Sequence, residues 1–458
     1  MNTPALTAGA HDAQGTAVSP SPSALALLPL LLFLALFFGA GLYYTARGDA
    51  MGFYQLRAPV AILPALALAL WLARRRGVPA QRTLLAGMGE SNVMLMCLIF
   101  LLAGAFATVS KAIGAVDAVV SLGLGALPAS LILPGLFAVA AFVSLSIGTS
   151  MGTLAAVVPI ALGVADASGI DRVLVLGAVL GGAMFGDNLS IISDTTIAAT
   201  RSQGAEMRDK FRENIRIALP AALATMLLLA WMGEGAPVHA PDSASPWLVV
   251  PYLLVLALAL AGLDVVLVLG IGLVVSGLFG LAFAESYDLA SFAGDVYAGF
   301  ESMVEITLLS ILIGGLAALM KACGGLAWLA GVIARFARGH AGRRSGEFSL
   351  AALAAGTDAL TANNTVAILV TGDLARDIAQ RHGVSPRRAA SVLDIFACVV
   401  QGVLPYGAQI LLAASLAAVS PLSLVGSVHY CWLLALSAVV FMLLPGRHRE
   451  SRASAAAD

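Results

Sequence analysis

Long apolar runs separated by short polar segments make up most of this chain. A helix needs ~20 mostly apolar residues to cross a bilayer. Three runs, 131–162, 172–200 and 389–420, are too long or too interrupted by Gly, Pro and polar residues to be simple helices. We therefore predict an all-α, polytopic membrane protein with about 10–13 transmembrane helices. The predicted spans are 24–45, 58–73, 90–110, 131–162, 172–200, 215–232, 247–263, 265–284, 302–320, 349–372, 389–420 and 424–444.

The composition strengthens this prediction. Of the 458 residues, 60% are hydrophobic and only 11% are charged, whereas soluble domains carry about 25% charged residues. A soluble protein of this size could not bury so much apolar surface, so we expect the lipid bilayer to be its main partner. No block of basic residues with interleaved aromatics is present, so we expect no nucleic-acid binding.

Basic segments indicate which loops face the cytoplasm, because Lys and Arg accumulate on that side. The segments 233–246 and 284–295 contain acidic residues but no Lys or Arg, so we predict that they lie outside. Segment 373–388 has mixed charge and is predicted to be cytoplasmic. The basic residues of the predicted cytoplasmic loops and tail are Arg74, Arg75, Arg76, Arg82, Arg201, Arg208, Lys210, Arg212, Arg216, Arg335, Arg338, Arg343, Arg344, Arg447, Arg449 and Arg452.

The first 22 residues are small and polar and lack Lys and Arg, so we expect a disordered tail and not a cleaved signal peptide. The four cysteines lie far apart in apolar runs with no CxxC spacing, which predicts packing residues and no bound cofactor. The six His are scattered and form no HExxH motif, so we predict that the protein is not an enzyme.

Two stretches of the chain resemble each other. Glu90 aligns with Glu301, Lys111 with Lys321, and Gly-Thr-Ser at 148–150 with Gly-Thr-Asp at 356–358, all at offsets of 208 to 211 residues. The first copy follows a predicted cytoplasmic loop and the second follows a predicted outside loop, so the two copies cross the membrane in opposite directions. Inverted-topology repeats with broken helices at the midplane are typical of secondary transporters.

This interpretation divides the chain into six parts. We predict an N-terminal tail (1–22), two transmembrane helices (23–84), transport repeat 1 (85–232), an outside loop with a connecting helix pair (233–295), transport repeat 2 (296–446) and a cytoplasmic tail (447–458).

The densest polar cluster inside an apolar run is 186–196, which contains Asp187, Asn188, Ser190, Ser193, Asp194 and Thr195. A charge at the bilayer centre costs at least ~3 kcal/mol on insertion scales, so two aspartates need partners there. Carboxylate, hydroxyl and amide oxygens are ligands for hard cations, and a carboxylate in apolar surroundings also holds protons readily. The alternative is a loop at the membrane surface with Asp194 as a helix N-cap.

Two further clusters occupy equivalent places in the repeats. In the first, Thr149, Ser150 and Thr153 lie beside glycines that allow the backbone to unwind, although Gly148 and Gly152 could instead form a helix-packing face. In the second, Asp358, Asn363, Asn364 and Thr365 interrupt an apolar span, where an Asn-Asn pair needs hydrogen-bond partners.

Four secondary candidates complete the set. Asp394 and Gln401 are seven residues apart and share a helix face, and Gln409 follows a break at Pro405 and Gly407. Asp394 is either a proton carrier or the partner of a basic side chain, and the sequence does not decide between them. Glu305 is a plausible carboxylate inside the membrane.

Taken together, the stretch Phe-Gly-Asp-Asn-Leu-Ser-Ile-Ile-Ser-Asp-Thr-Thr at 185–196 resembles the Gly-Asp-Lys-x-Ser-Pro-x-Ser-Asp-Thr-Thr pattern of the NhaC family of bacterial sodium/proton antiporters, within the ion transporter superfamily. Asn188 and Ile191 stand where that family often has Lys and Pro. The stretches 148–153 and 399–408 are also similar to family features. The resemblance covers about residues 85–445.

The resemblance implies exchange of external H⁺ for internal Na⁺ across a bacterial inner membrane by alternating access. Na⁺ would bind at Asp187, Asp194 and Asp358, with the polar residues of the two repeats forming the two halves of one site. Related members exchange organic acids, so a Na⁺- or H⁺-coupled transporter of organic acids or amino acids is the alternative. No Arg lies in the middle of the apolar spans, which favours a cation over an organic anion. The sequence allows a homodimer.

Overall fold

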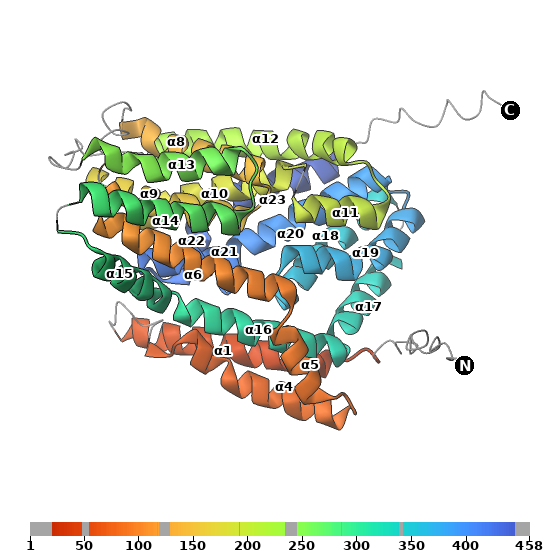
Figure 1. Cartoon of the computed structure of the whole chain (residues 1–458). Coiled ribbons are helices and arrows are strands. Elements are labelled where there is room, and N and C mark those ends of the chain that lie inside the picture. Colours follow the sequence, from red (N-terminus) through yellow and green to blue (C-terminus); the bar gives the residue numbers. More distant parts are fainter. Residues whose placement is uncertain are drawn as a thin grey trace, which may run out of the picture.

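The computed structural model describes residues 21–47, 55–116, 118, 129–191, 193–233, 245–284, 286–338 and 342–444. Every regular element in these residues is a helix (Figure 1). The predicted all-α class is therefore confirmed. The predicted C-terminal tail and most of the predicted N-terminal tail and of outside loop 233–246 lie outside the described residues.

Apolar helices of membrane-spanning length confirm a polytopic membrane protein. Within the described ranges, nine helices are long and apolar enough to cross a bilayer, and a bent pair, Pro421–Ser427 with His429–Leu443, adds a tenth candidate. The nine are Ala24–Tyr44, Ala58–Arg75, Ser91–Ala112, Ser150–Ser168, Arg172–Gln203, Met207–Met232, Val265–Phe283, Val304–Ala322 and Pro386–Ala417.

Two series of helices follow the same order along the chain. Each has a short helix, a long helix, a pair of helices joined at a tight break, a broken span and a final long helix. The first series is α5 (Ala80–Met88), α6 (Ser91–Ala112), α8 (Ile132–Ile147), α9 (Ser150–Ser168), α10 (Arg172–Leu189), α11 (Asp194–Gln203) and α12 (Met207–Met232). The second is α15 (Leu289–Ser302), α16 (Val304–Ala322), α18 (Arg343–Thr361), α19 (Asn364–Arg381), α20 (Pro386–Val403), α21 (Ala408–Ala417), α22 (Pro421–Ser427) and α23 (His429–Leu443), with α17 (Gly325–Arg338) between α16 and α18.

The remaining helices flank these series. Helices α13 (Val250–Leu260) and α14 (Val265–Phe283) connect them, preceded by η3 (Pro246–Val249), and η2 (Ala129–Leu131) leads into α8. At the N-terminus, η1 (Ala24–Leu27), α1 (Leu28–Ala46), α3 (Ala58–Ala61) and α4 (Leu63–Arg75) lie along α16 (Figure 1). Helix α15 begins at Asp288, where hydrogen bonds from the backbone and hydroxyl of Ser291 hold the pKa of this exposed carboxyl below its usual range.

The two series pack on each other reciprocally. Helix α5 packs on α16, and its counterpart α15 packs on α6. Both contacts bring backbones together at glycines: a Cβ at Gly104 would overlap the carbonyl oxygen of Gly299, and one at Gly314 would lie 2.7 Å from that of Gly87. Helices α6 and α16 run in opposite directions in Figure 1. This arrangement is expected of inverted repeats related by a pseudo-two-fold axis.

The segment 131–162, which the sequence predicts to be too long or interrupted for a simple helix, folds back on itself as a helical hairpin, here called hairpin 1 (α8 and α9). Helix α8 runs parallel to α10, since Gly182 lies against Phe137 and Gly186 lies against Ser144. Helix α9 returns the other way. Its end lies at the start of α10, where Asp166 and Arg172 form an ion pair of 2.6 Å.

Two local features produce the tip of hairpin 1. Gly148 ends α8 in the left-handed region, with φ 79°, a conformation that glycine adopts without the steric cost of a Cβ. The next residue, Thr149, is extended and occupies the N-cap position of α9. The glycine that the sequence suggested for unwinding therefore turns the chain.

The predicted span 349–372 is also a hairpin, here called hairpin 2 (α18 and α19). Gly346 near its beginning lies against His382 at its end. At the tip, Ala362 adopts a left-handed conformation, and the Asn363 side-chain oxygen accepts the backbone N–H of Val366 at 2.9 Å as the N-cap of α19. Figure 1 shows the two hairpins at opposite ends of the molecule, with their tips toward the middle.

Two broken spans pass between the hairpins, as the sequence predicted. Helix α10 ends at Leu189 and α11 resumes at Asp194, while α20 ends at Val403 and α21 resumes at Ala408. Pro405 explains the second break, because a residue before proline, here the extended Leu404, disfavours the helical region. At the first break, the Thr196 hydroxyl donates to the carbonyl of Ser190 at 2.7 Å.

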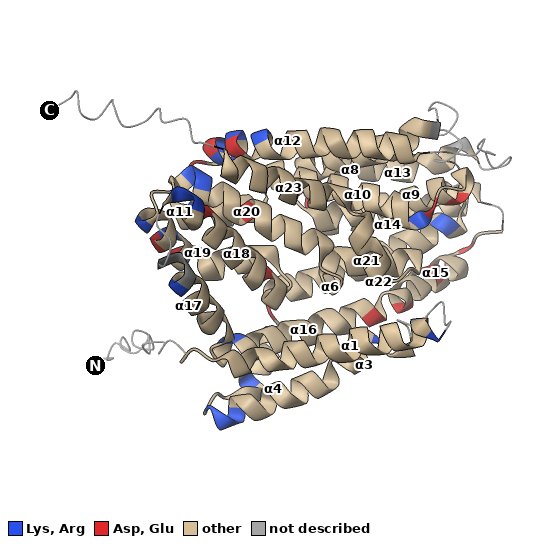
Figure 2. Cartoon of the chain, turned by 180° about the vertical axis from the view of Figure 1, so that it is seen from behind, with Lys and Arg blue, Asp and Glu red and all other residues tan. Residues whose placement is uncertain are grey.

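Charged residues gather at the end of the molecule where α11, α17 and the start of α12 lie, and the middle is nearly free of them (Figure 2). By the positive-inside rule, we infer that this end faces the cytoplasm. The basic segment 201–216 is not simply a loop, because most of it belongs to α11 and α12. Lys210 within it is 1% exposed and points into the protein.

Candidate functional site

The tips of both hairpins and both helix breaks meet at one cavity of about 100 Å³, here called the aspartate cavity. Its polar lining comes from hairpin 1 (Thr149, Ser150), the first break (Asp187, Ser193, Asp194, Thr195), hairpin 2 (Asn363, Asn364, Thr365), the second break (Gln401, Gln409) and Asn92 of α6. Eleven of these twelve residues are sequence-predicted candidates. The structure thus brings the two predicted halves together.

Asp187 is the buried carboxylate of this cavity. It lies in the last turn of α10 and is 5% exposed. One carboxylate oxygen accepts the hydroxyl of Ser150 at 2.8 Å, and the other accepts the hydroxyl of Ser193 at 2.6 Å. Because Ser150 starts α9 and Ser193 caps α11, Asp187 joins the tip of hairpin 1 to the first break.

An amide chain extends this network to the second break. The Gln401 side-chain amide donates to the Gln409 carbonyl oxygen at 2.6 Å, and the Gln409 amide donates to the Ser150 hydroxyl at 3.2 Å. The Gln401 side-chain oxygen is buried and has no hydrogen-bond partner among the described residues. This oxygen can therefore accept a hydrogen bond from a ligand in the cavity or coordinate a cation there.

Asp194 differs from Asp187 in its exposure. It lines the same cavity in the first turn of α11, but its side chain is exposed. Ser193, not Asp194, occupies the N-cap position, so the alternative that made Asp194 the cap is wrong. The cavity therefore combines one buried and one accessible carboxylate.

The lining of the aspartate cavity suits a small cation. It provides two carboxylates together with hydroxyl and amide oxygens, the ligands that hard cations take. None of its described lining residues is Lys, Arg or His. The helix ends of α8, α10, α18 and α20 also meet here, and helix C-termini attract positive charge. The helix N-termini of α9, α11, α19 and α21 also lie here and favour negative charge, so the two effects oppose each other. The lining side chains therefore decide whether the cavity prefers a cation.

Residues 148–152 have the Gly-x-Ser-x-Gly spacing found around some hydrolase nucleophiles. Here Ser150 donates to the Asp187 carboxylate, and no histidine is among the residues that line the cavity in the described part of the chain. The described lining of the cavity therefore lacks the histidine of the Ser-His-Asp/Glu triad found in those hydrolases.

Some predicted residues do not line the aspartate cavity. The Ser190 hydroxyl donates to the carbonyl of Leu145 at 3.1 Å, and the Thr153 hydroxyl donates to that of Thr149 at 3.0 Å. Both therefore stabilise helix ends. Glu305 pairs with Arg57 at 3.4 Å on the far side of α16, where its side chain is 30% exposed.

Asp358 is fully buried in α18, one turn before the tip of hairpin 2, and does not line the cavity. Neither carboxylate oxygen has a hydrogen-bond partner in the part of the chain that the structure describes. An ionised carboxylate without donors or a counter-ion is very costly to bury. The three carboxylates predicted for one sodium site are thus not one cluster, and the described residues contain no metal-type group of three His, Cys, Asp or Glu.

A second polar network lies behind the first break. Asp394, fully buried in α20, pairs with Lys210 of α12 at 2.7 Å. The same carboxylate oxygen accepts the amides of Asn188 at 2.7 Å and Asn214 at 2.9 Å. Asn188 therefore points away from the aspartate cavity. Of the two roles left open for Asp394, the geometry supports the partner of a basic side chain.

Sequence reasoning missed Lys210 and Asn214 because the surrounding basic residues suggested a loop. A signal was present: Lys210, Asn214, Ile217 and Ala221 recur at helical spacing, and all four are buried on one face of α12.

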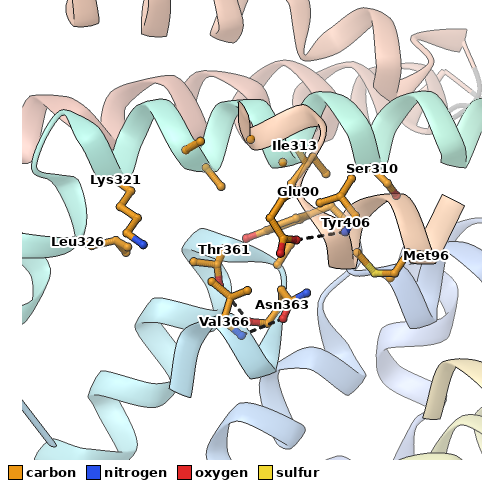
Figure 3. A pocket seen from close by; sticks show the side chains of 17 residues that line it. Glu90, Met96, Ser310, Ile313, Lys321, Leu326, Thr361, Asn363, Val366 and Tyr406 are labelled. Atoms are coloured by element: carbon orange, nitrogen blue, oxygen red, sulfur yellow. Dashed lines mark hydrogen bonds between the residues drawn. The ribbon is translucent and has the colours of Figure 1, made fainter. Parts of the chain in front are cut away.

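A second, mostly apolar cavity of about 170 Å³ adjoins the first and shares Met96, Ala362 and Asn363 with it. We call it the apolar cavity. Figure 3 shows Glu90 and Lys321 extending toward it from one side and the tip of hairpin 2 lying on the other. Glu90 is held as the N-cap of α6 by the backbone N–H groups of Asn92 and Val93.

Comparisons with known proteins identify relatives. A model described as the Na⁺/H⁺ antiporter family matches residues 63–234 and 242–445. The Na(+)/H(+) antiporter NhaC of Bacillus subtilis (strain 168) is 25% identical over 350 residues, which cover 70% of this chain and 76% of the relative. NhaC of Alkalihalophilus pseudofirmus is 26% identical over 312 residues, covering 61% and 67%.

Other similarities are more distant or shorter. The malate-2H(+)/Na(+)-lactate antiporter of Bacillus subtilis is 26% identical over 251 residues, covering 51% of this chain and 53% of the relative. Among solved structures, the YdaH transporter of Alcanivorax borkumensis aligns over 92% of this chain and 98% of that chain, with a TM-score of 0.44 and 13% identity.

Proposed function

Because the chain belongs to the Na⁺/H⁺ antiporter family, we propose that it exchanges external H⁺ for internal Na⁺ across a bacterial inner membrane. The observation that carries this proposal is the aspartate cavity, where two carboxylates face hydroxyl and amide oxygens and no basic side chain of the described residues intervenes. Na⁺ and H⁺ are the cargo, and the proposed exchange needs no cofactor.

Asp187 is proposed as the group for which the two ions compete. With a proton on its carboxyl group, Asp187 is neutral. Sodium would displace that proton and take the carboxylate together with hydroxyl oxygens of Ser150 and Ser193, whose hydrogen atoms can rotate away. Asp194, on the exposed side, would attract the incoming ion. Only one of the two ions is bound at a time, which makes the transport an exchange.

The hairpins supply a route to alternating access. Each tip contacts the cavity from one end of the molecule, and the two repeats meet at glycine contacts that allow close sliding. Rocking one repeat against the other would open the cavity first to one side and then to the other. Hydrogen bonds from Ser150 to Asp187 couple the tip of hairpin 1 to the state of the site.

The test uses inverted membrane vesicles with a pH-sensitive dye. We expect Na⁺ addition to release accumulated protons from vesicles containing the unmodified protein. Asp187→Asn keeps the shape of the side chain and removes its charge, so this response should fall at least ten-fold, about 1.4 kcal/mol or more. The matched control is Asp209→Asn, which neutralises an exposed aspartate paired with Arg212 at the molecule's charged end. Full exchange by Asp187→Asn would contradict the site assignment.

An organic acid is the second candidate cargo, because the apolar cavity beside the aspartate cavity has room for a small molecule and is reached by Lys321. One relative is named for malate and lactate exchange. Proteoliposomes loaded with labelled malate or lactate would separate the two functions. Counterflow of either acid that depends on Na⁺ or H⁺ would favour this candidate, and Na⁺/H⁺ exchange without any acid would favour the first.

A further inference from the structure

Lys210 is the most deeply buried basic side chain in the described part of the molecule, at 1% exposure. Its ammonium group has three hydrogen atoms to donate. Three oxygens lie around it: Asp394 Oδ2 at 2.7 Å, the Asn188 carbonyl at 2.8 Å and Thr196 Oγ1 at 2.7 Å. They belong to α20, α10 and α11. Every donor of this ammonium group therefore has a partner on a different element.

Two of these partners lie on either side of the first helix break. The Asn188 carbonyl belongs to the last turn of α10, directly after Asp187. Thr196 lies in the first turn of α11, and its hydroxyl donates a hydrogen bond to the Ser190 carbonyl at 2.7 Å. Asn214, one turn further along α12 than Lys210, donates to the Asn188 carbonyl at 3.1 Å. Lys210 and Asn214 together fix the backbone that carries Asp187.

The pair also balances charge next to the cavity. Without Lys210, Asp394 would be a second buried carboxylate without a counter-ion close to Asp187. Asn188, the residue after Asp187, donates a hydrogen bond to Asp394. Within the described residues, the titratable groups that interact electrostatically with Asp394 include Asp187 on α10, Cys398 on α20 and Tyr430 on α23. None of these is basic, so Lys210 is the source of positive charge.

We propose that Lys210 is a positioning residue for cation exchange: paired with Asp394, it holds the break between α10 and α11 so that Asp187 and Ser193 face the aspartate cavity. The inference rests on the proposed function. The Lys210 ammonium group reaches the last turn of α10 from α12.

The test compares four full-length proteins in proteoliposomes: unmodified, Lys210→Met, Lys210→Met with Asp394→Asn, and the control Arg212→Met. Arg212 lies on the same helix, but its side chain is 73% exposed. Proton movement is measured against Na⁺ concentration and pH, and folded protein is quantified by size-exclusion chromatography.

We expect Lys210→Met to raise the KM for Na⁺ at least ten-fold and to change kcat far less, because the break that presents Asp187 and Ser193 is no longer held. The double variant removes the uncompensated Asp394 charge and should recover folded protein, yet keep the raised KM. Arg212→Met should match the unmodified protein.

Two results would overturn the inference. One is a KM for Na⁺ of Lys210→Met equal to that of the unmodified protein. If Lys210→Met does not fold, the overturning result is a double variant whose KM for Na⁺ equals that of the unmodified protein. Both differ from failure of the proposed function, which would appear as no Na⁺-dependent proton movement in the unmodified protein.

Discussion

Three fully or almost fully buried aspartates near the middle of this molecule have three different environments. Asp187 accepts hydrogen bonds from two serines, Asp394 pairs with Lys210, and Asp358 has no partner among the described residues. Burying an ionised carboxylate is tolerated only when donors or a counter-ion replace water. Under the proposed function, these environments correspond to different chemical roles: Asp187 exchanges ions, Asp394 forms a fixed ion pair, and Asp358 is tolerated only when it is neutralised.

Asp358→Asn tests the last of these roles. Asparagine has nearly the same shape and resembles the protonated acid, so we expect the thermal unfolding midpoint of the purified protein to stay equal or to rise by a few degrees. If Asp358 exchanges a proton during transport, Na⁺-driven proton movement should fall by roughly ten-fold, about 1.4 kcal/mol, because asparagine does not take up or release a proton. A midpoint that drops clearly would show instead that the ionised Asp358 carboxylate stabilises the folded protein.

At this scale, the sequence identifies polar positions but not the directions of their side chains. The polar residues of 186–196 stand out because apolar residues surround them. Consecutive helical residues point about 100° apart, so Asp187 faces the cavity while Asn188 faces Asp394. A cluster read from sequence therefore contains both the site and the network that supports it, and only the packing of α12 and α20 separates them.

At the scale of elements, the sequence predicts where helices break but not how the chain continues. Gly148 marks a break in 131–162, yet an interrupted helix and a hairpin have the same local signal. The difference comes from long-range packing: α8 lies along α10, and Asp166 meets Arg172 at the end of α9. Pro405 carries a stronger local constraint, and the break predicted there is present.

Glycines on α10 let hairpin 1 approach it closely. A Cβ at Gly182 would overlap the carbonyl oxygen of Phe137 and lie 2.9 Å from the Cβ of Ala140. Gly182→Val should therefore displace α8 at a cost of about 1–3 kcal/mol or more, and lower the unfolding midpoint measured by fluorescence-detected size exclusion. Gly39→Val is the control, because nothing lies within 4 Å of a Cβ at this exposed position of α1. Equal midpoints for the two variants would show that the hairpin does not pack as described.

At the scale of the whole molecule, the two repeats make opposite ends of the protein similar in construction but different in charge. Lys111 ends α6 beside a cavity of about 680 Å³ that also contains Asp166 and Arg172. Lys321 ends α16 beside the apolar cavity. Because α6 and α16 are counterparts that run in opposite directions (Figure 1), their terminal lysines should reach opposite membrane surfaces.

Cysteine labelling tests this topology directly. Lys111 and Lys321 are exposed, and all four native cysteines are buried, so single Lys111→Cys and Lys321→Cys variants should label above a low background. A membrane-impermeant maleimide added to intact spheroplasts should modify Lys111→Cys but not Lys321→Cys, and permeabilisation should expose both. Arg212→Cys, at the basic end, is the control for an inside position. Labelling of both lysine positions from the same side would contradict the inverted repeat, because counterpart helices of opposite direction cannot end at one surface.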